Sequence, residues 1–99
     1  MASFGELVVI KKNGTDGHSF PLRQRKCVIG KEHDSDIRVH HPQVSTHHAT
    51  LDVDENNRVW ITNFSKRAPT LVNQTPVTES IEIFNGTVFT IGDRSFRLQ

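Results

Sequence analysis

Cysteine, tyrosine, tryptophan and long apolar runs are scarce or absent in this 99-residue sequence. The one cysteine, Cys27, cannot form an internal disulfide, and its apolar neighbours Val28 and Ile29 favour a buried, reduced thiol, which is typical of intracellular proteins. The longest apolar run, Leu7–Ile10, is far shorter than the ~20 residues needed to cross a bilayer. We therefore expect neither a membrane anchor nor a secretion signal.

An excess of either charge is also missing, because 12 Lys and Arg residues face 11 Asp and Glu residues and the formal net charge is +1. This balance gives no general attraction to nucleic acids or anionic membranes. With one tryptophan and no tyrosine, the sequence has no RNA-binding aromatic motif. Two short basic clusters, Lys11–Lys12 and Arg23–Lys26, are interpreted as solvated faces, although the second could attract an acidic or multiply phosphorylated partner.

Metal-ligand and catalytic spacings are absent as well. The six histidines include the pairs His40–His41 and His47–His48, but neighbours on a strand point to opposite faces, and no His or Cys set has zinc-finger spacing. Ser45, His48 and Asp36 could be named as nucleophile, base and acid, but no nucleophile-elbow glycine pattern surrounds the serine. We predict no metal, no cofactor and no enzymatic activity.

The sequence does contain a series of short alternations of apolar and polar residues, which predict β-strands. In Ala49–Asp54 an apolar side chain recurs at every second residue. The turn-forming segment 54–57 then leads into Arg58–Thr62, so the two runs predict a hairpin with Trp60 as its large anchor. Further strands are expected near Glu6–Lys11, Ser19–Leu22, Lys26–Ile29, Asp36–Val39, Thr70–Val72, Ile81–Ile83, Thr87–Ile91 and Arg94–Leu98.

The fold class follows from the spacing of these strands. No window sustains a helical stripe, and turn signals such as Asn13-Gly14 and Asn85-Gly86 recur about every ten residues. This pattern predicts an all-β fold, an antiparallel β-sandwich of about eleven short strands that forms one domain over residues 1–99. Phe64 and Phe84 are predicted to lie in its core.

Residues suited to anion binding gather in three predicted connections. The first, Gly30–Asp36, places a cation after a glycine, the second, Pro42–His48, holds two hydroxyls, and the third, Asn63–Thr70, holds two cations before a proline. In a sandwich, loops at one end carry binding residues, and charged donors, hydroxyls and backbone N–H groups are what a phosphate requires. The same residue types are also common in ordinary surface loops, so composition alone leaves both interpretations open.

The order and spacing of these motifs resemble the forkhead-associated (FHA) domain family. Gly30-Lys31, the Ser-x-x-His motif at 45–48, then Thr62–Ser65 and Thr70–Asn73 follow the family's signature in order. The resemblance implies a sandwich with its binding loops at one end, which binds phosphothreonine in partner proteins. Other segments resemble one vertebrate member of the family in particular, namely Leu7–Lys12, Asp16–Leu22, Asn63–Ser65, Pro69-Thr70 and Asp93–Arg97.

The resemblance also implies roles for single residues. Ser45 is expected to donate to the phosphate, Thr46 to contact the peptide, and Lys31 to stand where the family usually has an arginine. Lysine keeps the charge but lacks the planar fork that grips phosphate with two bonds. Arg67-Ala68 replaces the usual Thr-Asn, so that Arg67 supplies a charged donor and Ala68 lacks the amide that usually holds the peptide backbone. Loop-structural roles fall to Gly30, His48, Asn63 and Asn73.

The first hypothesis is therefore a phosphothreonine-dependent protein-interaction module that binds kinase-primed proteins through Lys31, Ser45, Thr46 and Arg67. The resemblance implies a nuclear, cell-cycle setting, at the nucleolus or the chromosome surface, and a monomeric isolated domain that binds neither nucleic acid nor membrane. A longer partner segment could also add a strand along an exposed sheet edge. The alternative is an FHA-like structural or phosphate-independent interaction domain with a degenerate pocket, and nucleic-acid binding is a distant third.

Overall fold

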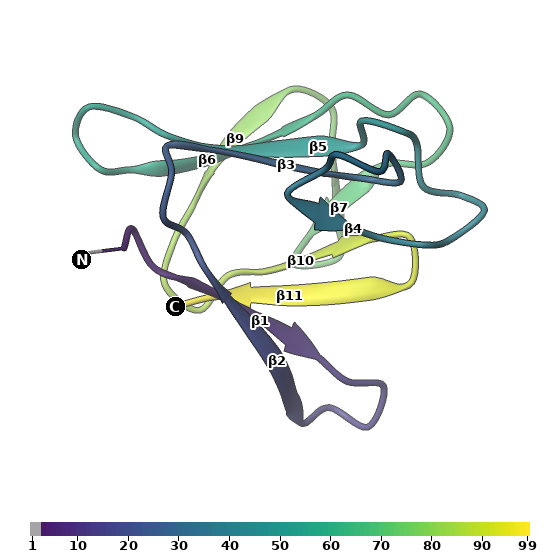
Figure 1. Cartoon of the computed structure of the whole chain (residues 1–99), viewed down its shortest axis with the longest axis horizontal. Helices are drawn as coiled ribbons and strands as arrows, with labels where there is room; N and C mark the ends of the chain where they lie inside the picture. Colours follow the sequence, from purple (N-terminus) through teal and green to yellow (C-terminus); the bar gives the residue numbers. More distant parts are fainter. Residues whose placement is uncertain (1–2) are drawn as a thin grey trace.

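The computed structural model describes residues 3–99 and shows two packed β-sheets (Figure 1). The strands are β1 (Glu6–Ile10), β2 (Asp16–Pro21), β3 (Lys26–Gly30), β4 (Ile37–Arg38), β5 (Ala49–Val53), β6 (Val59–Asn63), β7 (Thr70–Val72), β8 (Thr75–Val77), β9 (Ser80–Ile83), β10 (Val88–Ile91) and β11 (Arg94–Leu98). One sheet has the order β2-β1-β11-β10-β7-β8 and the other β4-β3-β5-β6-β9. The described residues include no helix long and apolar enough to cross a membrane.

The predicted all-β sandwich is confirmed, with two differences in detail. Strand β8 was not predicted, because only one of its three side chains, Val77, is buried and no alternation can show in so short a run. Strand β4 pairs with β3 in parallel, through Ile29 with Ile37 and Gly30 with Arg38, so the second sheet is mixed where a purely antiparallel one was expected.

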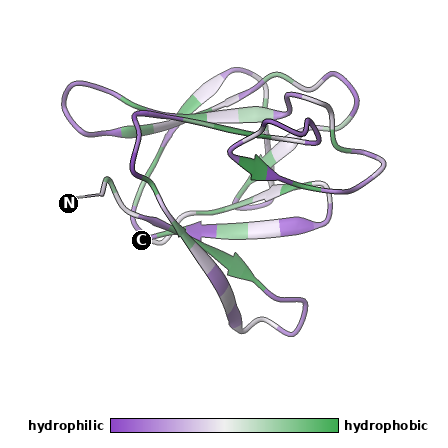
Figure 2. Ribbon diagram, in the orientation of Figure 1, coloured by the Kyte–Doolittle hydropathy of each residue, from purple (hydrophilic) through white to green (hydrophobic). Residues whose placement is uncertain are grey.

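The core lies between the two sheets and is formed by the side chains at every second position of the strands. Ala49, Leu51 and Val53 on β5 are buried, and Val59 and Ile61 on the paired strand β6 are buried beside them, as the predicted hairpin requires. Hydrophobic residues lie mainly on the strands and hydrophilic ones mainly on the loops (Figure 2). Strand pairing therefore places the loops at the ends of a packed scaffold.

Cys27 is part of this core and has no disulfide partner. Burial, reinforced by the negative charge of Asp36, raises the pKa of the Cys27 thiol to about 12. The side chain is therefore a protonated, unreactive core group, as its apolar neighbours on β3 indicated.

Two aromatic residues, Phe64 and Phe84, lie outside the core predicted for them, and Trp60, the predicted anchor of the hairpin, is only partly buried. Trp60 lies on the outer face of β6, and its Nε1 donates to Asp54 Oδ2 at 2.9 Å, because Val59 and Ile61 take the inward positions of that strand. Phe64 and Phe84 are 56% and 60% exposed, since each lies just beyond a strand end, where alternation no longer turns the side chain inward. The large aromatic side chains of the core are instead Phe89 and Phe96, with ring centroids 5.2 Å apart.

Candidate functional site

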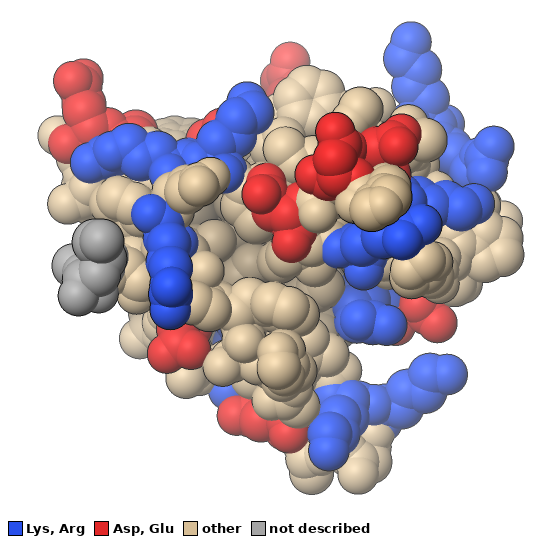
Figure 3. Space-filling view, viewed as in Figure 1, with Lys and Arg blue, Asp and Glu red and all other residues tan. Residues whose placement is uncertain are grey.

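Three loops meet at one end of the sandwich, the β3–β4 loop (31–36), the β4–β5 loop (39–48) and the β6–β7 loop (64–69). They surround an open depression of about 510 Å³. Several Lys and Arg side chains lie on the side of the molecule where these loops are, beside a group of Asp and Glu side chains, and other Lys and Arg side chains lie on the opposite side (Figure 3). The depression is lined by Lys31, Glu32, His33, Arg38, Val44, Ser45, Thr46 and Arg67, so the four predicted phosphopeptide-binding residues share one surface.

Gly30 allows the first two loops to approach each other. A Cβ at this position would overlap the backbone carbonyl of Thr46 and lie 3.2 Å from the Cα of His47. With no side chain in the way, the Lys31 N–H donates to the Ser45 carbonyl at 3.0 Å, and the Glu32 N–H donates to the Thr46 carbonyl at 3.1 Å. The glycine therefore places the Lys31 and Ser45 side chains on adjacent backbone segments.

His48 joins the loops from beneath the depression. Its side chain is 0% exposed, and its Nδ1 accepts the N–H of Ser45 at 3.1 Å. Its backbone carbonyl accepts the N–H groups of Phe64 and Ser65 at 2.9 and 3.2 Å. One residue thus fixes both the serine that lines the depression and the start of the third loop.

The His48 ring is held in its neutral form. Because Nδ1 accepts a hydrogen bond, the neutral ring carries its hydrogen on Nε2. Burial lowers the pKa of His48, and the backbone of Ala68 opposes this shift only in part. Nε2 is buried without a hydrogen bond of good geometry among the described residues. The neutral ring therefore stabilises the loops and contributes no positive charge to the depression.

A pair of hydroxyls sets the direction in which Ser45 can donate. Ser45 Oγ lies 2.7 Å from Ser65 Oγ, and the latter also accepts the N–H groups of Arg67 and Ala68, both at 3.2 Å. A hydroxyl has two acceptor lone pairs and one hydrogen, so the two N–H groups on Ser65 Oγ favour Ser65 as the donor to Ser45, although either hydroxyl can donate in this pair. When Ser65 donates, the hydrogen of Ser45 is available to an anion in the depression.

Asn63 gives the third loop its shape. Its Nδ2 donates to the Ser65 carbonyl at 3.1 Å, while its Oδ1 accepts the Ser65 N–H at 3.3 Å and the hydroxyl of buried Thr70 at 3.0 Å. These bonds close the loop across its base. Neither Ser65 nor Thr70 was singled out from the sequence, although both belong to the quoted motifs.

The depression is bordered by three cationic side chains. Arg67 Nη1 donates to the Pro42 carbonyl at 2.9 Å, which ties the third loop to the second. Arg38 Nε donates to the Lys31 carbonyl at 3.3 Å, which aligns this side chain with the first loop. The sequence analysis did not include Arg38 among the site residues. The alternation of the predicted strand could have indicated it, because Arg38 is exposed next to the buried Ile37.

Asn73 lies apart from the depression. It occupies the β7–β8 turn with a φ of 48°, and Gln74 beside it has a φ of 73°. The Asn73 N–H donates to the Val88 carbonyl at 2.8 Å, and its Oδ1 accepts the Val88 N–H at 3.2 Å. This residue therefore fixes a turn to β10 and does not touch the three loops that line the depression.

The residues of the imagined hydrolytic site are engaged elsewhere. Ser45 Oγ pairs with Ser65, His48 Nδ1 receives a backbone N–H and not the serine hydroxyl, and Asp36 Oδ2 accepts the Val28 N–H at 2.7 Å. The three side chains therefore do not form a hydrogen-bonded chain from nucleophile to base to acid. Within residues 3–99, no three His, Cys, Asp or Glu side chains come together as a metal site.

Comparison with known proteins gives a family match over the region that carries these loops. A family model described as FHA domain matches residues 27–92. Proliferation marker protein Ki-67 is 40% identical over 99 residues in Mus musculus and over 93 residues in Homo sapiens, which is 100% and 94% of this chain. The chain spans 3% of the length of each of these two relatives.

Solved structures share the fold at low sequence identity. An FHA domain studied for phosphothreonine-dependent interactions has a TM-score of 0.81 and 21% identity, and the match covers 99% of this chain and 96% of that one. Mycobacterium tuberculosis EmbR in complex with a low affinity phosphopeptide has a TM-score of 0.82 and 23% identity, over 95% of this chain and 24% of EmbR. These similarities establish the sandwich and its connections.

Proposed function

The chain belongs to the FHA domain family, and from this premise we propose that it is a phosphothreonine-dependent protein-interaction module. The observation that carries the proposal is the convergence of Lys31, Ser45, Thr46 and Arg67 on one depression. Charged donors beside a correctly directed hydroxyl form a surface suited to a phosphate dianion. The proposed module binds a partner protein and catalyses no reaction.

Each group has a distinct part in holding the phosphate. The Ser45 hydroxyl donates one directed hydrogen bond, because Ser65 occupies its acceptor side. Lys31 contributes a compact charge, whereas Arg38 and Arg67 contribute planar forks that can bind two phosphate oxygens at once. Two arginines in reach of the same depression thus compensate for the lysine in the usual arginine position.

The identity to Ki-67 supports a setting for the partner. A protein named as a proliferation marker is consistent with a nuclear, cell-cycle partner that a kinase has primed. We extend the proposal to a monomeric module that binds such a partner in the nucleus, including the nucleolus or the chromosome surface. An FHA-like domain that binds its partner without phosphate is the competing function, since Ala68 lacks the side-chain amide at the third loop.

The test is an NMR titration of the isotope-labelled domain with paired phosphothreonine and unphosphorylated peptide libraries. We expect phosphate-dependent shifts at Lys31, Ser45 and Arg67. Ser45→Ala should weaken binding by about tenfold or more, because a hydrogen bond to a charged group is lost. Arg38→Ala should weaken it as well, whereas Lys12→Ala, which removes an exposed cation from the β1–β2 turn, should not.

Two results would contradict this proposal. Equal responses to both libraries would identify a phosphate-independent interaction domain. Equal losses in Arg38→Ala and Lys12→Ala would mean that the domain senses only net charge and that the depression holds no specific phosphate site.

A further inference from the structure

One carboxylate lies among the cations of the proposed phosphate site. Glu32 follows Lys31 in the first site loop and lines the same depression as this lysine and the two arginines. It is the one acidic residue among the described residues that line the depression. A carboxylate repels a phosphate dianion bound beside it, so Glu32 lowers the affinity for phosphate unless the ligand also brings a positive charge.

The backbone around Glu32 holds this residue at the border of the depression. Its N–H donates to the Thr46 carbonyl at 3.1 Å, and its own carbonyl accepts the Ser35 N–H, also at 3.1 Å. Glu32 is partly buried, whereas its neighbours Lys31 and His33 are exposed. The Glu32 side chain therefore extends from a fixed point of the loop.

The Glu32 carboxylate has no cationic partner within residues 3–99. Its Oε1 accepts the N–H of the next residue, His33, at 3.3 Å, which is long for such a bond. The ion pairs of the described chain lie elsewhere and join Lys26 to Asp52, Arg58 to Glu82, and Arg97 to Asp16. One oxygen of the Glu32 carboxylate is therefore available to a ligand.

The other carboxylates of the first loop do not take the same part. Asp36 Oδ2 accepts the Val28 N–H at 2.7 Å, and neither Asp36 nor Asp34 lines the depression. Acidic side chains lie beside basic ones on this side of the molecule (Figure 3). A ligand that carries both a phosphate and a positive charge is complementary to this surface, whereas a phosphate with acidic neighbours is not.

We infer that Glu32 selects partner segments in which a lysine or arginine lies close to the phosphothreonine, and that it disfavours an acidic residue at the same place. The inference rests on the proposed function, because the phosphate must first occupy the depression. The basic side chain of the partner forms a charge-assisted hydrogen bond with the available oxygen of Glu32. Glu32 thus discriminates among phosphorylated segments by their neighbouring residues, through attraction of one charge and repulsion of the other.

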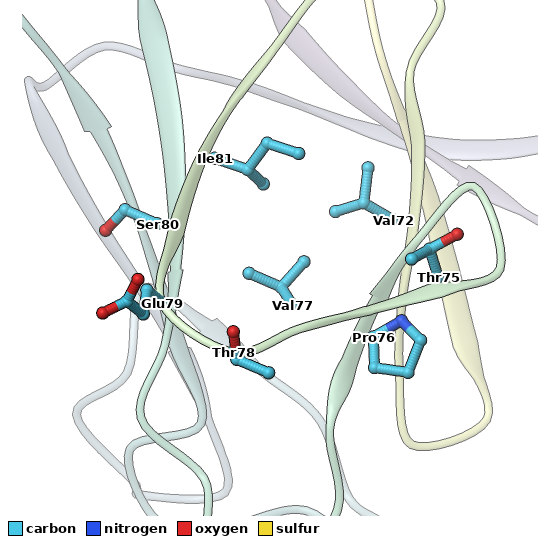
Figure 4. A pocket seen from close by; sticks show the side chains of 8 residues that line it. All are labelled: Val72, Thr75, Pro76, Val77, Thr78, Glu79, Ser80 and Ile81. Atoms are coloured by element: carbon cyan, nitrogen blue, oxygen red, sulfur yellow. The ribbon is translucent and has the colours of Figure 1, made fainter.

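A glutamate on another concave surface provides a matched control. Glu79 lies at the rim of a hollow of about 230 Å³ between β8 and β9, into which Val72, Val77 and Ile81 project (Figure 4). Glu79 is exposed and does not line the phosphate-site depression. Glu79→Gln therefore makes the same change of charge as Glu32→Gln and leaves the proposed site unaltered.

The test uses phosphothreonine peptides with about five residues on either side of the phosphate, in an otherwise Ala, Ser and Gly sequence. One position at a time carries arginine, its uncharged isostere citrulline, or glutamate. We expect one position at which arginine binds about fivefold more tightly than citrulline, and glutamate more weakly than either. Glu32→Gln should abolish this preference, Glu32→Lys should make glutamate the preferred residue, and Glu79→Gln should retain the preference for arginine.

A second measurement uses the wild-type domain and needs no variant. The ¹³C chemical shift of the Glu32 carboxyl carbon should move on saturation with the preferred arginine peptide and stay in place with its citrulline counterpart. The preference for arginine should also decrease as the salt concentration rises, because ions screen a charge pair at the protein surface.

Three outcomes would overturn this inference. They are an arginine preference of equal size at every position, which reports net charge alone, a preference that persists in Glu32→Gln, and a preference that Glu79→Gln removes to the same extent. The citrulline phosphopeptide separates this inference from the proposed function. If that peptide binds no better than its unphosphorylated form, the proposed function has failed, whereas phosphate-dependent binding to which arginine adds nothing contradicts only the role of Glu32.

Discussion

At the scale of single residues, Gly30 determines how closely two of the three site loops approach. A methyl group there would collide with the Thr46 backbone, which cannot rotate away as a flexible side chain could. We expect Gly30→Ala to lower the free energy of unfolding by about 1–3 kcal/mol and to weaken phosphopeptide binding. Urea unfolding and the NMR titration measure the two effects.

Gly17→Ala is the matched control for this change. A Cβ at Gly17 would lie 3.3 Å from both the flexible Lys11 side chain and the Val9 carbonyl oxygen, without the overlap found at Gly30, and it is on an edge strand away from the depression. Gly17→Ala should therefore change the free energy of unfolding much less than Gly30→Ala does, and it should leave phosphopeptide binding unchanged. If the two variants behave alike, the close approach at Gly30 does not constrain the site.

At the scale of elements, the turn of the β7–β8 hairpin holds a non-glycine residue in a strained backbone conformation. Gln74 has a φ of 73°, a left-handed conformation that glycine adopts without the cost of a Cβ, and Asn-Gly is the favoured pair for such a turn. Gln74→Gly should therefore raise the free energy of unfolding by about 0.5–1 kcal/mol, measured by urea unfolding.

Gln24→Gly provides the comparison for this turn. Gln24 is exposed in a loop and has no positive φ, so glycine there should only add flexibility to the unfolded chain and lower stability slightly. Equal destabilisation by both substitutions would show that Gln74 is not strained.

The same element scale explains how much of the fold could be read from the sequence. A two-residue period identifies strands of five residues such as β5 and β6, because each buries two or three side chains on one face. The period fails for β8, which buries one side chain, and it cannot say whether β4 runs parallel or antiparallel to β3. Pairing direction depends on the path of the connecting loop, which a local pattern does not contain.

The candidate site was predictable to a similar extent. The motif order gave four residues that share one depression, but Arg38 and the Ser65 hydroxyl were missed. Arg38 reaches the site through parallel pairing of β3 and β4, and Ser65 acts through a contact with Ser45 twenty residues away in the sequence. Both contributions depend on long-range packing. The core positions predicted for Phe64 and Phe84 were wrong because both residues lie just beyond a strand end, which a local pattern does not locate to one residue.

At the scale of the whole molecule, acid should destabilise the domain in two stages. Burial lowers the pKa of His48, so the unfolded chain takes up a proton before the folded one, and stability should fall as the pH drops below about 6.5. Hydrogen bonds from Arg97 to Asp16 and from Trp60 to Asp54 lower the pKa values of these carboxyls. Their stabilisation is present above about pH 4 and is lost as the pH falls further.

Urea unfolding from pH 7 to pH 3 measures both stages. The double variant Asp16→Asn, Asp54→Asn should be less stable at pH 7 and should lose part of the lower stage, while the stage near pH 6.5 remains. A variant curve parallel to wild type down to pH 3 would show that these two carboxylates do not account for the acid sensitivity.

The two ends of the described chain leave the sandwich together. The Glu6 N–H donates to the Gln99 carbonyl at 2.7 Å, and both ends lie on the side away from the three site loops (Figure 1). A single attachment at this place would therefore leave the three site loops facing outward. If a flexible tether were joined there, its length would set the local concentration at which these loops meet a binding partner.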